Sequence, residues 1–354
     1  MNKVEQIDAN FAVNTTIKRD GTRFYPATAD CFSIHGICAS EGKFRRMPRE
    51  VAEGISEGVS TLHTHTAGGR IRFCTTSSYV IISAKMTNIF KMPHFTLLGS
   101  AGFDLYEKID GKQVFIGSGL PPMDINEGYD SIWELDGQKL HELTLHFPLY
   151  SGVDTLYIGL DENANVASAP AYSFPKPVVY YGSSITQGGC ASRPGNAYPN
   201  QISLMLDCDH INLGFSGNAK AEDTMADYIC QMDMSALVLD YDHNAPDPEY
   251  LEKTHKKMFD RIRTAKPELP IIMLSMPRIP PMRNTAQLKR MEIIQRTYNS
   301  AIADGDQNVY FIPGIELFGE RAEIATVDNC HPNDIGFYLM ASKIAPILKS
   351  IITK

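Results

Sequence analysis

From residue 178 onward, short apolar runs alternate with long amphipathic segments, and this pattern constrains the fold more than any other feature. The apolar runs predict strands at Val178–Tyr181, His210–Phe215, Ala236–Tyr241, Ile271–Met276 and Val309–Ile312. The segments between and after them predict helices near Tyr198–Leu206, Ala221–Cys230, Pro248–Ala265, Gln287–Ala303 and Asp334–Lys349. Strands that are apolar throughout and alternate with helices indicate a five-stranded parallel sheet with both faces covered. Ligands bind beyond the carboxyl ends of the strands in such sheets, so the residues after each strand are candidates for chemistry.

The first half of the chain has a different pattern, in which short apolar runs often alternate with polar residues. Strands are predicted within Arg70–Met86, His94–Gly117, His141–Pro148 and Val153–Leu160, and Asp110-Gly111 predicts a hairpin turn. Helical spacing is scarce here, so we expect an all-β sandwich. Three prolines (Pro170, Pro175 and Pro177) predict a linker, which divides the chain into domains at residues 1–170 and 176–354.

The composition is typical of an ordinary globular protein, with 43% hydrophobic and 21% charged residues. A formal net charge of −8 argues against nucleic-acid and anionic-membrane partners, because their binding surfaces need clustered Lys and Arg. The N-terminus lacks the apolar segment of a signal peptide, and we identify no apolar run long enough to span a bilayer. The seven cysteines are scattered and form no CxxC pair, which favours reduced thiols; we therefore expect a cytoplasmic location.

Polar residues follow the predicted strands at four places. They are Gly182-Ser183-Ser184, the glycines Gly214 and Gly217, the run Asp240 to Asn244, and the pair Asp328 and His331. Each group alone has a plain structural explanation: a serine that caps a helix, a glycine turn, an Asx turn before Pro246, or a structural His–Asp pair.

Together, these residues supply the parts that a serine nucleophile requires. His331 can take the proton of Ser184, and Asp328, three residues earlier, can orient the imidazole and stabilise its charged form. Backbone N–H groups after the first two strands and the Asn244 amide can stabilise an oxyanion. The pattern therefore predicts acyl transfer at one edge of the sheet.

These motifs resemble the SGNH (GDSL-type) hydrolases, whose named residues match Ser184, Gly217, Asn244 and His331, with Asp328 beside the histidine. The segment "GFDLY" (Gly102–Tyr106) resembles the β-sandwich domain that precedes the hydrolase domain in the GxDLY subfamily. The resemblance implies a jelly-roll-like sandwich followed by a three-layer, flavodoxin-like α/β domain. Two departures stand out: Ser183 replaces the usual Asp, and Asp242-His243-Asn244-Ala245 replaces the usual Gly-x-Asn-Asp.

The resemblance implies a serine esterase that forms an acyl-enzyme on Ser184, with an oxyanion hole made by Ser184, Gly217 and Asn244. We expect its substrate to be a small molecule or oligosaccharide, with removal of a small acyl group, acetyl first, from O-acylated carbohydrate. The alternatives are a lipid or thioester acylhydrolase, or a carbohydrate-binding protein whose hydrolase domain is weak or inactive. The sequence leaves the oligomeric state open.

Some polar residues have two interpretations. Arg278, after the fourth predicted strand, either contacts a polar substrate or bonds loop carbonyls at the surface. His63 and His65 alternate on one predicted strand face, which is either a metal site or a solvated face. No HExxH or clustered-ligand pattern is present, so we expect neither a cofactor nor a metal.

Overall fold

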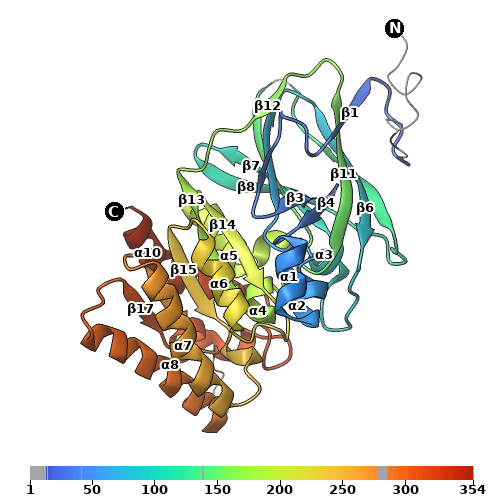
Figure 1. The fold of residues 1–354 in the computed structure, drawn as a ribbon. Coiled ribbons are helices and arrows are strands. Elements are labelled where there is room, and N and C mark those ends of the chain that lie inside the picture. The colour runs from blue at the N-terminus through green and yellow to red at the C-terminus, as the bar shows by residue number, and fades with distance from the viewer. Residues whose placement is uncertain (1–12, 14, 41, 138, 278–284, 354) are drawn as a thin grey trace.

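The computed structural model describes residues 13, 15–40, 42–137, 139–277 and 285–353. The first half of the chain forms an antiparallel β-sandwich, and the second half forms an α/β unit against one end of it (Figure 1). The fold class predicted from the sequence is therefore confirmed.

Two antiparallel sheets make up the sandwich. One has the order β1-β11-β6-β9, and the other has the order β12-β5-β10-β7-β8, with β2 also paired to β5. The strands are β1 (Thr22–Pro26), β2 (Ser33–His35), β5 (Arg70–Thr75), β6 (Tyr79–Thr87), β7 (Phe103–Ile109), β8 (Lys112–Gly119), β9 (Gly128–Glu134), β10 (His141–His146), β11 (Gly152–Asp161) and β12 (Val166–Ser168). A small separate hairpin pairs β3 (Cys38–Ser40) with β4 (Lys43–Arg45).

Alternate residues of these strands face inward and form one apolar core, which includes Phe73, Ile82 and Ile158. The turn predicted between β7 and β8 is confirmed, because Asp110 and Gly111 join these strands with positive φ angles of 50° and 75°. This backbone matches the twist of the paired strands in a two-residue hairpin.

Three short helices in this half were not predicted. They are α1 (Arg49–Ile55), α2 (Glu57–Leu62) and α3 (Leu97–Ala101), so the strand expected to begin near His94 starts only at Phe103. The strand expected at His63 and His65 is also wrong, because His63 follows the last residue of α2 and His65 makes an isolated bridge to Gly152. Both histidines are buried rather than solvated.

The α/β unit contains a parallel sheet with the order β14-β13-β15-β16-β17. Its strands are β13 (Phe174–Gly182), β14 (Cys208–Gly214), β15 (Ala236–Asp240), β16 (Ile271–Leu274) and β17 (Val309–Ile312). The helices are α4 (Ser184–Gln187), α5 (Tyr198–Leu206), α6 (Asp223–Gln231), α7 (Pro248–Ala265), α8 (Thr285–Ala303), α9 (Gly314–Phe318) and α10 (Asp334–Ile352). Short 3₁₀ turns are present at Pro194–Asn196 (η3), Asp242–Asn244 (η4) and Gly319–Ile324 (η5). Pro175 and Pro177 lie within β13, so the segment predicted as a linker is shorter in the structure.

Both faces of this sheet are buried, as the continuous apolar runs predicted. Val179 and Tyr181 of β13 belong to the core under α6, α7 and α8, whereas Val178 and Tyr180 belong to the core under α5 and α10. The strand order is the flavodoxin-like one. In such sheets, ligands bind where the connections that leave neighbouring strands go to opposite faces of the sheet. Here that position is the carboxyl end of β13, between β14 and β15.

Two glycines allow the close packing at this edge. Parallel pairing places Gly182 of β13 beside Gly214 of β14 and Asp240 of β15. A Cβ atom on Gly182 would lie 2.0 Å from Thr186 Oγ1, and one on Gly214 would lie 2.2 Å from the Gln187 nitrogen. Only glycine therefore lets α4 fold back directly over the ends of the strands.

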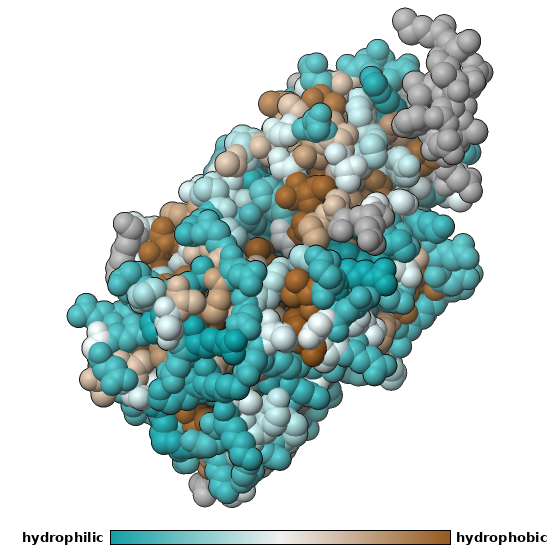
Figure 2. Space-filling view, viewed as in Figure 1, coloured by the Kyte–Doolittle hydropathy of each residue, from teal (hydrophilic) through white to brown (hydrophobic). Residues whose placement is uncertain are grey.

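Among the described residues, one helix, α10, is long and apolar enough to cross a membrane by length and composition, with a mean hydropathy of 1.4 over its window. This corrects our expectation that no such segment exists. Its buried side chains, including Phe337, Met340 and Ile344, pack into the core beneath the sheet, as in a core helix. On the face shown in Figure 2, hydrophilic residues cover most of the α/β unit, and hydrophobic areas are small and separate.

Candidate active site

The two serines after β13 have different roles in the structure. Ser183 is fully buried, and its Oγ accepts a hydrogen bond from the Ile185 N–H at 3.2 Å as the N-cap of α4. Its own N–H donates to the carbonyl of Asp240 at 3.0 Å. Ser184 is the first residue of α4 and is partly exposed. The structural explanation that we gave for a serine here therefore applies to Ser183, while Ser184 remains available for chemistry.

Ser184, His331 and Asp328 form a continuous chain of hydrogen bonds. Ser184 Oγ lies 2.9 Å from His331 Nε2, and His331 Nδ1 lies 2.8 Å from Asp328 Oδ2. The other carboxylate oxygen, Oδ1, accepts from the backbone N–H groups of Cys330 and His331 at 3.1 and 2.7 Å. Although burial alone would raise the pKa of Asp328, these hydrogen bonds outweigh it and lower the pKa below its usual value. The carboxylate stays charged and holds Nδ1 protonated, which leaves Nε2 free to accept the serine proton.

The loop after β14 brings the predicted oxyanion donors to the same edge. The Phe215 N–H donates to the Gly182 carbonyl at 2.8 Å, and Asn244 Nδ2 donates to the Phe215 carbonyl at 2.9 Å. Gln187 Oε1 accepts from the Ser216 N–H at 3.1 Å and so joins the loop to α4. Gly217 follows with a φ of 71° and open space beside its Cα. The loop is therefore fixed both to η4 and to the turn Gly182–Ser184, which carries the candidate nucleophile and is called the nucleophile turn below.

Several polar hydrogens at this edge have no acceptor within the part of the chain that the structure describes. Among the described residues, the backbone N–H groups of Ser184 and Gly217 donate no hydrogen bond. The Asn244 amide has two N–H donors, and one of them is used by the Phe215 carbonyl. Unpaired donors at a partly open edge are what an oxyanion hole requires before substrate binds.

A buried acidic residue lies directly behind the nucleophile turn. Asp240 Oδ2 accepts hydrogen bonds from Thr186 Oγ1 at 2.8 Å and Tyr198 OH at 3.1 Å, and Oδ1 has no partner among the described residues. Burial, together with the charge of Asp242, raises the pKa of Asp240 to about 7. The protonated form of Asp240 suits this environment, because protonation removes a buried negative charge.

The unusual Asp242-His243 pair is also buried under the site. Asp242 Oδ2 accepts from the Met276 N–H at 2.9 Å, and Oδ1 lies 3.6 Å from His243 Nδ1. Burial would lower the pKa of His243, but Asp242 and Cys330 outweigh it and raise the pKa to about 10. At 3.6 Å the contact with Asp242 is too long for a hydrogen bond, so the effect of this side chain on His243 is electrostatic.

The sandwich supplies one wall of the site, which the sequence analysis did not predict. Tyr150 OH donates to the Ser184 carbonyl at 3.2 Å, and Gln187 Nε2 donates to the Leu149 carbonyl at 3.1 Å. Gln187 Nε2 also lies 3.0 Å from His65 Nδ1. Burial lowers the pKa of His65 to about 3, so His65 is neutral and can accept this hydrogen bond. His65 is thus a structural partner of α4. Among the described residues, one group of side chains could hold a metal ion, and it includes neither His63 nor His65.

Arg46, at the end of the β3–β4 hairpin, is a second contribution of the N-terminal half. Its buried guanidinium donates to the carbonyls of Gly214, Asn212 and Leu62, and lies 4.6 Å from the centre of the Phe215 ring. Burial lowers the pKa of Arg46 to about 9, so the group is still charged at neutral pH. It fixes the end of β14 and the start of the Gly217 loop through backbone groups that no sequence pattern reveals.

The "GFDLY" motif has a structural role at the same interface. Asp104 is fully buried and accepts hydrogen bonds from Arg193 at 3.0 Å and from the Gly195 N–H at 2.8 Å. Tyr106 OH accepts another hydrogen bond from Arg193. The motif therefore binds the sandwich to the segment that follows α4.

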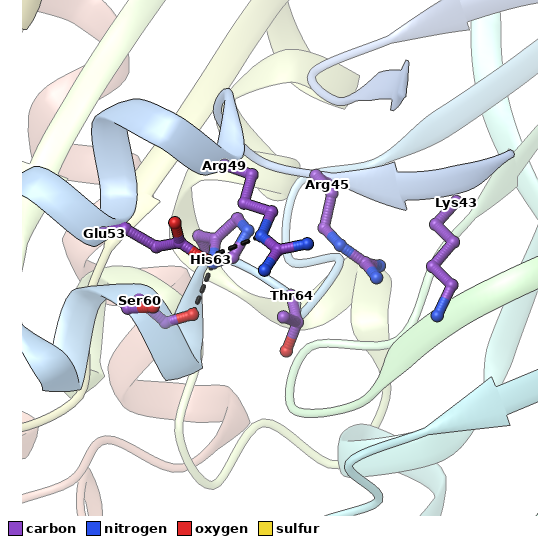
Figure 3. Close-up of a pocket in the computed structure, with 7 residues that line it drawn as sticks. All are labelled: Lys43, Arg45, Arg49, Glu53, Ser60, His63 and Thr64. Atoms are coloured by element: carbon purple, nitrogen blue, oxygen red, sulfur yellow. Dashed lines mark hydrogen bonds and ion pairs between the residues drawn. The ribbon is translucent and has the colours of Figure 1, made fainter. Parts of the chain in front are cut away.

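Other residues considered in the sequence lie elsewhere. Arg278 falls outside the described residues. A pocket of about 270 Å³ lies beside α1 and α2, and it contains His63 but none of the three hydrogen-bonded residues (Figure 3). It is lined by Lys43, Arg45, Arg49, Glu53, Ser60, His63 and Thr64. Arg49 is paired with Glu53, whereas Lys43 and Arg45 both lie near the single carboxylate of Asp154, at 3.6 and 3.7 Å.

Family models match both halves of the chain. The model for the GDSL-like lipase/acylhydrolase family matches residues 175–349, and the model for the GxDLY N-terminus of SGNH-type esterases matches residues 22–166. A solved structure from Bacteroides ovatus, assigned as a GDSL-like lipase, is 30% identical, with 94% of this chain and 98% of that chain covered and a TM-score of 0.84. The chain belongs to the GDSL-like lipase/acylhydrolase family. The resemblance found in the sequence is thereby confirmed.

More distant structures share the fold of this GDSL-like protein. The salicylyl-acyltransferase SsfX3 from a tetracycline biosynthetic pathway is 17% identical, with 94% and 98% of the two chains covered and a TM-score of 0.75. An acetyl xylan esterase from Butyrivibrio proteoclasticus is 13% identical, with 93% and 98% covered and a TM-score of 0.57. No curated protein sequence matched. The GDSL-like family and its esterase neighbours support an esterase or acylhydrolase.

Proposed function

We propose that this protein is a serine esterase that removes small acyl groups, acetyl first, from O-acylated carbohydrate. The observation that carries the proposal is the chain of hydrogen bonds from Ser184 through His331 to Asp328. A non-catalytic sugar-binding protein would have no physical need for a serine, a base and an orienting carboxylate in this order.

The reaction has two steps. His331 Nε2 takes the proton of Ser184 as Oγ attacks the ester carbonyl, and Asp328 stabilises the resulting imidazolium. The N–H groups of Ser184 and Gly217 and the free N–H of Asn244 stabilise the tetrahedral oxyanion. His331 then protonates the leaving alcohol, and water attacks the acyl-enzyme by the same route to release the acid.

Two observations support a small acyl group on a polar alcohol. One structural neighbour, which aligns with this chain over nearly its whole length, is an acetyl xylan esterase. This neighbour favours a carbohydrate acetate as the first substrate to test. On the protein side, the buried Tyr150 donates to the Ser184 carbonyl, and the buried Gln187 of α4 contacts the buried His65. We infer from this that the acyl side of the site has little room for a long chain.

Hydrolysis of p-nitrophenyl acetate by the wild type and by Ser184→Ala tests the nucleophile. Activity is expected only with the serine, and Ser183→Ala serves as the matched control because it removes the neighbouring hydroxyl. Activity that persists in Ser184→Ala contradicts the proposal. Binding of glycans without hydrolysis in the wild type favours the binding-protein alternative.

The substrate class needs a separate measurement. Acetate release from a panel of acetylated oligosaccharides is expected, with acetyl esters hydrolysed faster than octanoyl esters. Faster hydrolysis of octanoyl or thioester substrates favours the lipid or thioester acylhydrolase. Transfer of the acyl group to an added alcohol, in preference to water, indicates an acyltransferase.

A further inference from the structure

Three metal-ligating side chains from separate segments meet beside the proposed catalytic residues. They are His94 from the turn before α3 in the sandwich, Cys190 from the turn after α4, and His331. One ligand atom from each lies within 4.8 Å of the other two, and the His94 and His331 rings have their centres 5.8 Å apart. Because the ligands are distant in sequence, no spacing pattern could have predicted this group.

The backbone around the group is fixed by contacts between the two halves of the protein. Thr96 Oγ1 donates to the Ser192 carbonyl at 2.7 Å, which ties the His94 turn to the Cys190 turn. Packing of Phe95 against Tyr150, with ring centres 5.1 Å apart, holds the same turn from the other side. Cys190 itself has a φ of 73°, a left-handed conformation that a cysteine rarely adopts. The positions of the ligand-bearing turns are thus set before any ion binds.

The donor set suits zinc. Two imidazoles and one thiolate are common zinc ligands, and a three-ligand site leaves the fourth position to water. Bond lengths of about 2.0–2.3 Å in a tetrahedron bring the ligand atoms to roughly 3.3–3.6 Å from one another, so an adjustment of about 1 Å completes the site. The exposed His94 side chain can make this movement by changing its rotamer.

Asp328 prepares His331 for a metal as well as for a proton. Its hydrogen bond to Nδ1 leaves the lone pair of Nε2 available, which is the carboxylate–histidine arrangement found behind metal-ligating histidines. The Cys190 thiol would lose its proton to solvent on binding, as metal-bound thiols do. The same nitrogen that accepts the proton of Ser184 is therefore the one that a metal would occupy.

We propose that His94, Cys190 and His331 form a zinc-binding site, and that zinc inhibits the esterase by occupying Nε2 of His331. The inhibition rests on the proposed function, whereas the metal binding does not. The site gives the protein a means to be switched off by zinc through a ligand, His94, that the sandwich contributes.

Cobalt(II) tests the metal site independently of activity. The chelator-treated wild type, kept under a phosphine reductant, is expected to bind one equivalent of cobalt with a thiolate-to-cobalt charge-transfer band. Cys190→Ser should abolish the band, and Cys38→Ser, which removes an exposed thiol outside this group of ligands, should retain it. Ser184→Ala should also bind cobalt, because Ser184 is not a ligand. A band that persists in Cys190→Ser overturns the proposal.

Zinc inhibition of p-nitrophenyl acetate hydrolysis tests the consequence. Zinc should inhibit the wild type, and a chelator should restore activity, which excludes thiol oxidation as the cause. His94→Ala should require at least about tenfold more zinc for half-inhibition, since removing even an outer-shell partner costs 10–100-fold in affinity. Equal sensitivity of His94→Ala and the wild type overturns the inhibitory role. If the wild type has no esterase activity, the proposed function fails while the cobalt spectrum still decides the site.

Discussion

Replacing Asn244 with alanine is expected to slow turnover by about a hundredfold to a thousandfold without unfolding the protein. The structure separates two functions of this amide. One N–H donates to the Phe215 carbonyl at 2.9 Å, and the other is available to the substrate oxyanion. Loss of an oxyanion donor typically raises the barrier by about 2.7–4 kcal/mol, whereas loss of one neutral hydrogen bond lowers stability by only about 0.5–1.5 kcal/mol.

A second asparagine in the same loop provides the control. Asn218 Nδ2 donates to the Ser216 carbonyl at 2.7 Å, so Asn218→Ala removes a bond of the same kind close to Gly217. Asn218 has no place in the proposed oxyanion hole. We therefore expect similar, small losses of stability in both variants and a large loss of turnover only in Asn244→Ala.

The assay is steady-state hydrolysis of p-nitrophenyl acetate, combined with urea unfolding of each variant. Because the lost interaction exists only in the transition state, kcat and kcat/KM should fall together while KM changes little. Equal turnover in the wild type and Asn244→Ala, with both folded, would remove Asn244 from the oxyanion hole. An equal loss in Asn244→Ala and Asn218→Ala would show that loop geometry, rather than the amide donor, accounts for the effect.

Three further predictions concern buried polar groups. The pKa of Asp240 is raised from about 3.8 to about 7, so ionisation of Asp240 destabilises the folded state as pH rises through this window, by at most about 4 kcal/mol. Between pH 4 and pH 8, the free energy of urea unfolding of Asp240→Asn should therefore rise relative to that of the wild type. A difference between the two that stays constant with pH contradicts the assignment. Ser183→Ala should lower stability by about 1 kcal/mol, as expected for the loss of an N-cap. Its turnover should be far closer to that of the wild type than the turnover of Ser184→Ala. Equal losses of turnover would contradict the different roles assigned to the two serines. Arg46→Met leaves buried carbonyls without donors, so it should lower the unfolding free energy by about 1–3 kcal/mol and also slow turnover. Unchanged stability and turnover would exclude a role of Arg46 in fixing the Gly217 loop.

The sequence predicted the α/β unit well because its signals are local. The ranges Tyr198–Leu206 and Pro248–Ala265 agree with α5 and α7 at both ends, since each has a proline in its first turn and a regular apolar face. Strand β17 also agrees at both ends. In contrast, α1 to α3 have at most seven residues, and each contains a glycine, so they carry too little periodicity to be distinguished from loops.

The candidate site was predictable in part for the same reason. Ser184, Gly217 and Asn244 follow strands whose ends meet at one sheet edge, and Asp328 lies close to His331 in the sequence. Tyr150, His65 and Arg46 were not predictable, because their roles depend on how the sandwich packs against α4 and β14. Their sequence surroundings resemble those of any buried tyrosine, histidine or arginine. The catalytic roles of the predicted residues stay predictions until the variants are measured.

The contacts between the two halves indicate that the sandwich is part of the candidate active site. Asp104 and Tyr106 of the GxDLY motif hold Arg193, after α4, while Tyr150 contacts the backbone of Ser184 itself. Arg46 fixes the end of β14 through the Gly214 carbonyl. A sandwich that only carried substrate would need none of these buried bonds to the nucleophile turn. Because buried charges and carbonyls lose stability when their partners leave, the nucleophile turn and the sandwich should unfold together, and the α/β unit alone should lack an ordered site.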